Sequence, residues 1–445
     1  MIRSSKTEST LKEPIPWKLN RCRIVHPENQ SLIDDGLAVY FKAPYSYTKL
    51  PTLELHVHSG RAIIASLLTS LSTIPLLRPA EPGEFTKQAL LGGRLDLTQV
   101  EGLHDLIEAD TEVQRIWALE GALGTTRSKY DDLRQKVIHC LAQVEALIDF
   151  GEGEEIEEAK IEATSLLEQL KEHLNDHRRG ELVRSGIRMA IFGPPNAGKS
   201  SLFNYFANRD ASIVTSIPGT TRDVLELTLD IGGLPIIVAD TAGLRETEDI
   251  VESIGVERGM QTAKGADVKL CVLPLPDVLD PSSTPDKTII NIPEAVAPLL
   301  TQDSHILLNK SDLVPSINMT TVSIKNVPGL DLTGRVWAGS VSNGTGMAAF
   351  TESFSSSIKI SLGIETGSGG ADARIHAPLI TRERHRVHLE AACRFLEAFL
   401  SYGPDDVVFA AEELRYAAQA IGRVTGDILA DDILDAVFRD FCIGK

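Results

Sequence analysis

The sequence predicts a multidomain chain of mixed α/β and all-α class, in which a doubly wound α/β domain is inserted into a helical domain and follows a small α+β domain. A glycine-rich loop at residues 193–200, between a short apolar run and a helix start, is typical of the first strand–helix unit of such a sheet. Helical periodicity flanks this region, before residue 185 and after residue 361. Because either helical flank alone would have a thin core, one interrupted helical domain is the economical arrangement.

The N-terminal part has the alternation expected of strands. Apolar residues alternate at 37–41 and at 53–57, and a helical stretch follows near 62–71. The pattern then becomes helical, and five apolar residues step along one face of an amphipathic helix: Leu133, Val137, Leu141, Val144 and Ile148. We therefore expect a partial α+β domain at 1–85 and the first part of the helical domain at 86–185.

The C-terminal part, from residue 381 onward, is predicted to be helical again. Four apolar residues recur every four positions and predict a helix: Val387, Ala391, Phe395 and Phe399. The sequence GPDD at 403–406 ends that helix, and a further helix ends near Gly422. The second part of the helical domain is therefore expected at 361–445, and the α/β domain at 186–360.

Three segments of unusual composition interrupt these domains. Residues 152–158 are acidic and are expected to form a solvated loop or a helix end. Residues 274–298 form a Pro- and Ser-rich insert within the α/β domain. Residues 363–370 are rich in glycine and are expected to form a flexible joint.

Composition excludes several classes of protein. Of the 445 residues, 42% are hydrophobic and 24% are charged, which is typical of a folded chain rather than a disordered one. No apolar run approaches the roughly 20 residues that span a bilayer. The five cysteines are scattered without CxxC spacing, so a disulfide framework or a zinc site is not expected, and a reducing compartment is favoured. A net charge of −18 argues against broad binding of nucleic acid by the bare chain.

The sequence GPPNAGKS at 193–200 has the phosphate-binding loop pattern G-x-x-x-x-G-K-[ST]. Its glycines let several backbone N–H groups point at one anion, at the start of a helix whose dipole adds to that field. Lys199 would reach the β- and γ-phosphates, and the hydroxyl of Ser200 would hold Mg²⁺. The expected contacts of the loop with the nucleotide are Asn196, Ala197, Gly198, Lys199, Ser200 and Ser201.

A second motif, DTAG, follows an apolar run at 234–239 that is short enough to be a buried strand. An aspartate at the end of this strand can hold Mg²⁺ through water, and the glycine amide can reach a γ-phosphate. The expected contacts are Asp240, Thr241, Ala242 and Gly243.

A third motif, NKSD at 309–312, follows the apolar run at 305–308. The carboxylate of Asp312 can accept hydrogen bonds from the ring N–H and the amino group of guanine, a pair of donors that adenine lacks. Asn309 and Lys310 complete this base site, together with Ser340 of a later loop. Three motifs in this order, each after a strand, predict a GTP-binding domain.

The segment TSIPGTTRD at 215–223 supplies a threonine hydroxyl for Mg²⁺ and can order around a γ-phosphate. Position 244, directly after DTAG, is Leu244, where many GTPases carry a glutamine that orients the attacking water. Leucine cannot make that hydrogen bond, so hydrolysis must depend on another group. The spacing leaves four carboxylates as candidates: Glu246, Glu248, Asp249 and Glu252.

Several motifs together resemble the MnmE (TrmE) family of tRNA-modification GTPases. They are PGEFT at 82–86, GRLDLTQ at 93–99, PNAGKS in the phosphate loop, IPGTTRD at 217–223 and FCIGK at 441–445. The likeness runs from about residue 35 to the end and is typical of a mitochondrial, fungal-type member. It implies an N-terminal folate-binding domain and a helical domain with an inserted GTPase. It also implies modification of the wobble uridine of tRNAs at carbon 5.

The resemblance further implies partners and cofactors. Members form homodimers through the N-terminal domain, with a GTP-dependent contact between their GTPase domains. They work with an FAD-containing flavoprotein of the MnmG (GidA) family, and the tRNA is expected to bind through this complex. A folate such as 5-formyl-tetrahydrofolate carries the one-carbon unit, and K⁺ and Mg²⁺ accompany GTP. A monovalent cation near the phosphates can supply the charge that an arginine finger gives elsewhere.

Individual residues take roles from the resemblance alone. The K⁺ ligands fall on Asn196, Thr215, Ile217 and Thr220. Thr221 falls on the Mg²⁺ ligand, and Glu252 falls on the glutamate that positions water, so that the expected catalytic residues are Lys199, Thr221, Glu252 and Cys442. Folate contacts fall on Glu54, Arg94 and Lys445. By composition, Cys442 would more often be a small buried hydrophobe.

Two features depart from the family pattern. No segment before Leu32 matches the opening strand and Gly-Arg-Gly-Gly turn that helps form the folate pocket, so the N-terminal domain is expected to be partial. The loop at 340–342 lacks the basic or small third residue that is common there.

Two other functions are weighed against the first. One is a ribosome-assembly GTPase of the Era or EngA type, which would carry a basic RNA-binding module where this tail is helical and acidic. The other is a GTPase scaffold without one-carbon chemistry, which titration with 5-formyl-tetrahydrofolate would separate from the first. The insert and the leader favour a mitochondrial location, with bacterial cytoplasm as the alternative.

Overall fold

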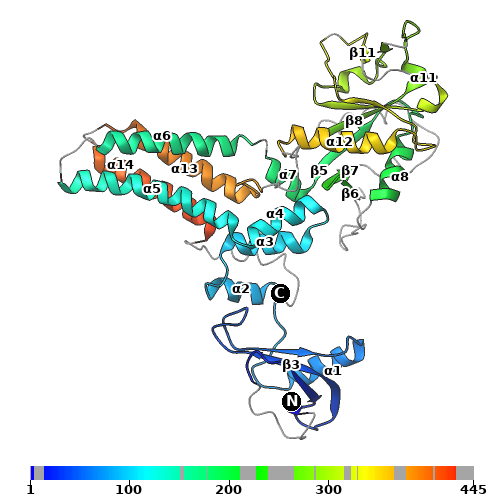
Figure 1. Cartoon of the computed structure of the whole chain (residues 1–445). Coiled ribbons are helices and arrows are strands. Elements are labelled where there is room, and N and C mark those ends of the chain that lie inside the picture. Colours follow the sequence, from blue (N-terminus) through cyan, green and yellow to red (C-terminus); the bar gives the residue numbers. More distant parts are fainter. Residues whose placement is uncertain are drawn as a thin grey trace. The chain divides into compact units, whose positions relative to one another are not determined.

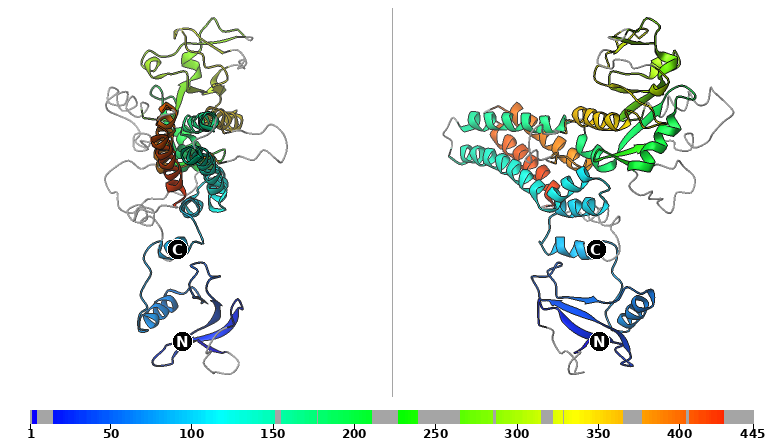
Figure 2. Two further views of the ribbon diagram at one scale, coloured as in Figure 1. Left: turned by 90° about the vertical axis from the view of Figure 1, so that its left-hand side faces the viewer. Right: turned by 45° about the vertical axis from the view of Figure 1, so that its right-hand side comes forward.

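The computed structural model (Figure 1 and Figure 2) describes residues 2–4, 15–150, 155–176, 178–210, 227–238, 265–284, 287–314, 322–327, 329–364, 377–403 and 406–426. The chain divides into two compact units. The first unit comprises Met1–His104, Ala122–Arg134 and Ala418–Lys445, and the second comprises Asp105–Gly121 and Gln135–Ala417.

The first unit contains a four-stranded antiparallel sheet in the order β1-β2-β3-β4. Its strands and the helix that follows them are β1 (Ile2–Ser4), β2 (Asn20–Val25), β3 (Leu32–Phe41), β4 (Thr52–His56) and α1 (Arg61–Ser72). The alternation at 37–41 and 53–57 therefore predicts β3 and β4 correctly. Cys22, Ala38 and Leu67 belong to the small buried core between the sheet and α1.

Helices occupy most of the chain between the sheet and the α/β region, and return after it. The first are α2 (Glu84–Leu91), α3 (Leu97–Glu108), α4 (Glu112–Ala122) and α5 (Thr125–Phe150). Two more follow before the α/β region, α6 (Glu155–Leu174) and α7 (Arg179–Ser185). After that region come α13 (Glu383–Ser401) and α14 (Val407–Thr425). The second-unit parts of α5 and α14 lie beside α6 and α13 (Figure 1 and Figure 2). The acidic stretch at 152–158 is expected to be either a solvated loop or a helix end. Since α6 begins at Glu155, part of this stretch is a helix end.

In the second unit, ion pairs link these helices across their exposed faces. Lys171 of α6 lies 2.7 Å from Glu397 of α13, and Arg415 of α14 lies 2.8 Å from Glu145 of α5. Within the second unit, segments from before and after the α/β region thus contact each other.

The C-terminal helix α13 is present as predicted, but it buries a different face from the four-residue repeat. Its buried residues are His385, Arg386, Leu389, Ala392, Cys393, Leu396 and Phe399, and Val387 is 48% exposed. At 3.6 residues per turn, positions four apart drift by about 40° each, so Val387 and Phe399 lie about 120° apart around the helix. A repeat of four residues therefore indicates a helix without identifying its buried face.

The α/β region contains a six-stranded sheet in the order β12-β10-β8-β5-β7-β6. All its neighbouring strands are parallel, except that β6 pairs antiparallel with β7. The strands are β5 (Ile187–Phe192), β6 (Leu227–Ile231), β7 (Leu234–Val238), β8 (Val268–Pro274), β10 (Ser304–Asn309) and β12 (Val336–Ala338). This sheet, which the phosphate loop pattern predicts, brings the ends of β5 and β10 to one edge.

Successive side chains of the strands pack on opposite faces of this sheet. On one face, Leu307 of β10 shares a core with α8 (Lys199–Asp210) and α12 (Met347–Ser361). On the other, Ile306 and Leu308 pack against residues that follow β8. The burial of β10 along its whole length explains the apolar run at 305–308.

The Pro- and Ser-rich insert forms ordered structure on this second face. It contains α11 (Leu275–Val278), β9 (Thr288–Ile290) and the 3₁₀ turn η1 (Ala297–Leu299), and β9 pairs parallel with β11 (Val322–Ile324). The carboxylate of Asp280 accepts hydrogen bonds from the amide of Asn291 at 2.8 Å and from Lys325 at 2.9 Å. These contacts tie the insert to later parts of the same region.

Helix α4 shares the core of the α/β region within the second unit. Val113 and Trp117 are buried in the same cluster as Ile231 of β6 and Ile236 of β7. The N–H of Val113 also donates to the carbonyl of Gly233, in the turn between those strands, at 3.3 Å. The turn that joins β6 to β7 is therefore attached to a helix of the N-terminal flank.

Candidate functional site

The predicted phosphate loop connects β5 to α8, at the carboxyl end of a central strand. Gly193 has φ +150°, and a Cβ there would stand 2.1 Å from the carbonyl oxygen of Val272. Gly198 has φ +93°, and a Cβ there would stand 2.2 Å from the amide nitrogen of Asn309. Both glycines of the pattern are therefore required by the close approach of the neighbouring strands, as well as by their backbone conformation.

The ammonium group of Lys199 lies across this loop. It donates hydrogen bonds to the carbonyl of Gly193 at 3.0 Å and to that of Pro194 at 2.8 Å. Burial lowers the pKa of Lys199 below its ordinary value, because desolvation disfavours the charged form. A phosphate anion at the loop would oppose this effect and stabilise the charge. In the first turn of α8, Ser200 and Ser201 are both exposed, so their side chains are accessible to an ion or a phosphate.

The buried side chain of Asn309 joins three loops of the predicted site. Its amide nitrogen donates to the carbonyl of Ala197 in the phosphate loop at 2.8 Å. Its amide oxygen accepts from the N–H of Lys310 at 2.8 Å and from the N–H of Val341 at 3.1 Å. Two motifs more than a hundred residues apart, and the loop after β12, are thus held together by one side chain.

The remaining base-side residues lie around Asn309. Asp312 is exposed in the 3₁₀ turn η2 (Ser311–Leu313), which follows Lys310 in a left-handed conformation at φ 62°. Ser340 is buried, and its hydroxyl lies 3.0 Å from the hydroxyl of Ser342. This arrangement provides an open carboxylate next to a rigid loop, which suits recognition of a purine edge.

Several predicted site residues lie outside the described residues. They are Thr215, Ile217, Thr220, Thr221, Asp240, Thr241, Ala242, Gly243, Glu252, Cys442 and Lys445. Strand β7 ends at Val238, two residues before Asp240 in the sequence. In the described ranges, no three His, Cys, Asp or Glu side chains cluster in a way that could hold a metal ion.

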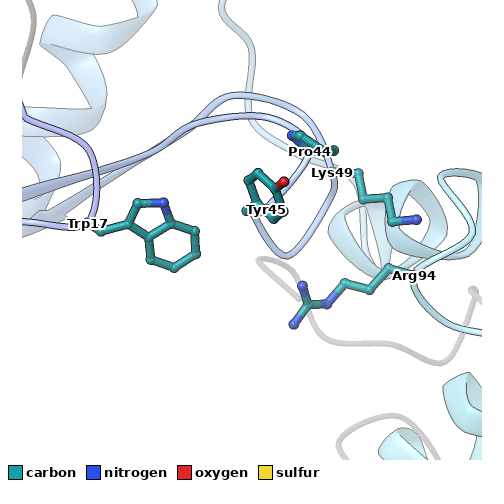
Figure 3. A pocket seen from close by; sticks show the side chains of 5 residues that line it. All are labelled: Trp17, Pro44, Tyr45, Lys49 and Arg94. Carbon is teal, nitrogen blue, oxygen red and sulfur yellow. The ribbon is translucent and has the colours of Figure 1, made fainter.

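A second candidate site lies in the first unit, where Arg94 lines a cavity of about 690 Å³ (Figure 3). Its other lining residues are Trp17, Pro44, Tyr45 and Lys49. No motif in the sequence marks these four positions, and only folding brings residue 17 near residue 94. Positive φ angles at Trp17 and Lys49 are not readable from the sequence either.

The two cations of this cavity are bound to backbone carbonyl groups. Arg94 donates to the carbonyl of Ser46 at 3.1 Å, and its guanidinium carbon lies 5.7 Å from the ring centroid of Tyr47. Lys49 donates to the carbonyl of Gly93 at 3.1 Å. None of the five lining residues is acidic, so the cavity favours an anionic ligand.

The structure does not bring Glu54 into this cavity. Glu54 lies on β4, where it is exposed and its carboxylate is 3.6 Å from a ring nitrogen of His56. Of the two predicted folate contacts among the described residues, only Arg94 lines the pocket.

Two family models match the chain in order. The model described as the GTP-binding protein TrmE N-terminus matches residues 2–94, and the model of the MnmE helical domain matches residues 97–442. The motifs predict a likeness only from about residue 35, whereas the match to the N-terminal model begins at residue 2. This earlier part of the match contains strands β1 and β2.

Curated relatives align over nearly the whole chain. The mitochondrial 5-taurinomethyluridine-[tRNA] synthase subunit GTPB3 of Danio rerio is 40% identical over 97% of this chain and 86% of its own length. The tRNA modification GTPase MnmE of Parvibaculum lavamentivorans is 42% identical over 98% of this chain and 92% of its own length. The tRNA modification GTPase MnmE of Rickettsia bellii is 37% identical over 95% of this chain and 89% of its own length.

These matches separate the functions that were weighed against each other. A ribosome-assembly GTPase of the Era or EngA type would not match the helical-domain model across residues 97–442. With the phosphate loop, the base-side loops and both family models on one chain, this chain belongs to the MnmE (TrmE) family and is a GTPase that acts in tRNA modification.

Proposed function

We propose that this chain is a Mg²⁺-dependent, K⁺-stimulated GTPase that takes part in modifying carbon 5 of the uridine at position 34 of certain tRNAs, together with a flavoprotein of the MnmG (GidA) family. The observation that carries the nucleotide part is a pair of hydrogen bonds, in which the side chain of Asn309 donates to the carbonyl of Ala197 and accepts from the N–H of Val341. They join the phosphate loop to the base-side loops in one pocket. The tRNA part is supported by the names of the aligned relatives.

Hydrolysis joins a water oxygen to the γ-phosphorus and breaks the bond from that phosphorus to the bridging β–γ oxygen. Lys199 would neutralise charge on the β- and γ-phosphates, since its ammonium already lies across the loop. Ser200 and Thr221 would hold Mg²⁺. Glu252 would orient the attacking water, because Leu244 cannot. Asp312 would select guanine.

A K⁺ ion would supply positive charge beside the phosphates, in place of an arginine finger. Its proposed ligands are Asn196, Thr215, Ile217 and Thr220. Asn196 is exposed on the phosphate loop with a left-handed backbone at φ 57°, which leaves its side chain available to a cation.

The cavity lined by Arg94 and Lys49 fits a folate, which carries a flat ring at one end and carboxylates at the other. We therefore favour one-carbon chemistry over a scaffold role. A bound folate would supply the one-carbon unit, and Arg94 would bind and orient it. Glu54, Lys445 and Cys442 are further candidates from the family likeness, with Cys442 as a catalytic residue.

The same likeness indicates a homodimer formed through the N-terminal domain. This is supported by β4, an edge strand of its sheet on which Leu53 is 46% exposed. Unpaired backbone groups and apolar side chains at a sheet edge favour pairing with a second chain. A second, GTP-dependent contact would join the GTPase domains. With a net charge of −18, the tRNA would bind mainly through the complex with the flavoprotein.

We favour a mitochondrial location, supported by the mitochondrial relative from Danio rerio, with bacterial cytoplasm as the alternative. Across the described helices, none is long and apolar enough to cross a membrane.

The proposal is tested in cells whose own copy of the gene is replaced by the Lys199→Ala variant. Mass spectrometry of purified tRNA should then find unmodified uridine at position 34, and the wild-type gene should restore the modification. Full modification with a stable Lys199→Ala protein would overturn the link between GTP hydrolysis and the tRNA. In vitro, hydrolysis should be slower in Na⁺ than in K⁺, and equal rates would remove the K⁺ proposal.

A further inference from the structure

Trp17 is an exposed aromatic residue held in a fixed place. It is 58% exposed, and its ring packs edge-on against Phe41, with centroids 5.0 Å apart. Its backbone N–H donates to the carbonyl of Tyr40 at 3.0 Å, and its φ is 64°. A left-handed conformation is unfavourable for a residue of this size, and such strain persists where surrounding contacts enforce it. Trp17 therefore presents a rigid aromatic surface that the small core of this unit does not use.

Lys49 lies at the other side of the cavity, also with a left-handed backbone at φ 58°. Although it is more than forty residues away in the sequence, the turn at Gly92 and Gly93 contacts Lys49. A Cβ at Gly92 would lie 3.3 Å from the Cβ of Lys49, so the absence of a side chain there admits the lysine. Within the described part of the chain, Lys49 and Arg94 contact carbonyl oxygens and the ring of Tyr47, and neither forms an ion pair with a carboxylate. Their charges are open to an anion.

The lining residues are arranged with opposite chemistry at the two sides. Figure 3 shows Trp17 on one side, Lys49 and Arg94 on the other, and Tyr45 and Pro44 between them. A volume of about 690 Å³ is within the range of small-molecule sites. This order of groups fits a ligand with a flat heteroaromatic ring at one end and negative charge at the other.

We propose that Trp17 and Lys49 are binding residues of the folate pocket, and that they divide its recognition. Trp17, with Tyr45, holds the flat pterin ring by stacking, and Lys49, with Arg94, holds the carboxylates of the glutamate tail. The proposal rests on the folate part of the proposed function and names the residues that select its ligand. No motif of the family likeness includes Trp17 or Lys49.

The test is calorimetric titration of the purified full-length protein with two ligands, 5-formyl-tetrahydrofolate and 6-methyl-tetrahydropterin, which keeps the pterin ring and has no carboxylate. Trp17→Ala should weaken binding of both ligands roughly tenfold, since stacking on an aromatic residue contributes similarly to either. Lys49→Ala should weaken binding of the folate about fivefold and leave binding of the tetrahydropterin unchanged, because an exposed charge pair contributes modestly and only the folate carries carboxylates. Trp17→Phe should retain most of the affinity.

Matched controls separate these effects from damage to the fold. Leu19→Ala removes another exposed apolar side chain two positions from Trp17, and Lys42→Ala removes another lysine of the same loop outside the cavity. Both should bind the folate as the wild type does. GTP affinity, which belongs to the second unit, should be the same in every variant and reports that the second unit is folded. Unchanged folate binding by Leu19→Ala and Lys42→Ala reports that the first unit tolerates nearby truncations.

Each other outcome overturns something specific. If the wild type binds the folate and neither Trp17→Ala nor Lys49→Ala changes its affinity, this inference is wrong while the folate part of the proposed function stands. If the wild type binds no folate, this inference and the folate part of the proposed function are both wrong, while the GTPase activity is unaffected. A third titrant, uridine monophosphate, also has a flat ring and a negative charge, but these are a nucleobase and a phosphate. Tighter binding of this nucleotide, weakened by the same two variants, would assign the cavity to a nucleotide instead.

Discussion

Asn309→Ala tests whether one buried side chain holds the nucleotide pocket together. The variant removes three hydrogen bonds, to Ala197, Lys310 and Val341, of 2.8, 2.8 and 3.1 Å. Asn309 is 4% exposed, so water does not readily replace them. At about 1 kcal/mol each, the free energy of unfolding should fall by about 3 kcal/mol.

The same change should weaken GTP binding, because the phosphate loop and the base-side loops would no longer share a support. Binding would then have to re-order these loops at a cost of about 1.4 kcal/mol, which raises the Kd for GTP about tenfold. Calorimetric titration with GTP measures the affinity, and differential scanning calorimetry measures the stability of the same sample.

Asn326→Ala is the matched control, since Asn326 makes two hydrogen bonds with the backbone of Ile292 in the insert, at 2.8 and 2.6 Å. Because Asn326 is exposed, water can partly replace these bonds, so this variant should lower the free energy of unfolding by less than Asn309→Ala does and should leave GTP affinity unchanged. The reasoning fails if Asn309→Ala lowers GTP affinity no more than Asn326→Ala does.

Three further predictions concern single residues. Glu252→Ala should leave the Kd for GTP nearly unchanged and lower turnover, since the carboxylate would act only on the attacking water; a collapse of binding would contradict that role. Asp312→Asn should weaken selection of GTP over xanthosine triphosphate in competition titrations, and unchanged selectivity would remove the base contact. Burial lowers the pKa of His305 to about 4 from 6.5, so the unfolded chain binds more protons between these values and stability is lost as the pH falls through them. The free energy of unfolding, measured with urea, should be about 2 kcal/mol lower at pH 5 than at pH 7 because of this group. His305→Phe should not show that contribution to the pH dependence.

Local patterns in the sequence are sufficient to predict the phosphate loop and the strands around it. A loop of glycines between β5 and α8, and the apolar runs of β7 and β10, carry their signal within a few residues. The order of the motifs also predicts that their loops meet at one edge of a parallel sheet. The hydrogen bond from Asn309 to the carbonyl of Ala197 is a direct contact between two of these loops.

The tertiary structure alone decided which side chains share a surface. The repeat at Val387 and Phe399 predicts α13 but not its buried face, because packing against α6 selects the face and the four-residue spacing drifts around the helix. Trp17 and Lys49 carry no local signal, since each acquires its place from a left-handed backbone and from contacts with distant residues. A motif is recognisable where one short segment performs the chemistry, whereas a pocket assembled from residues 17, 49 and 94 exists only once the chain has folded.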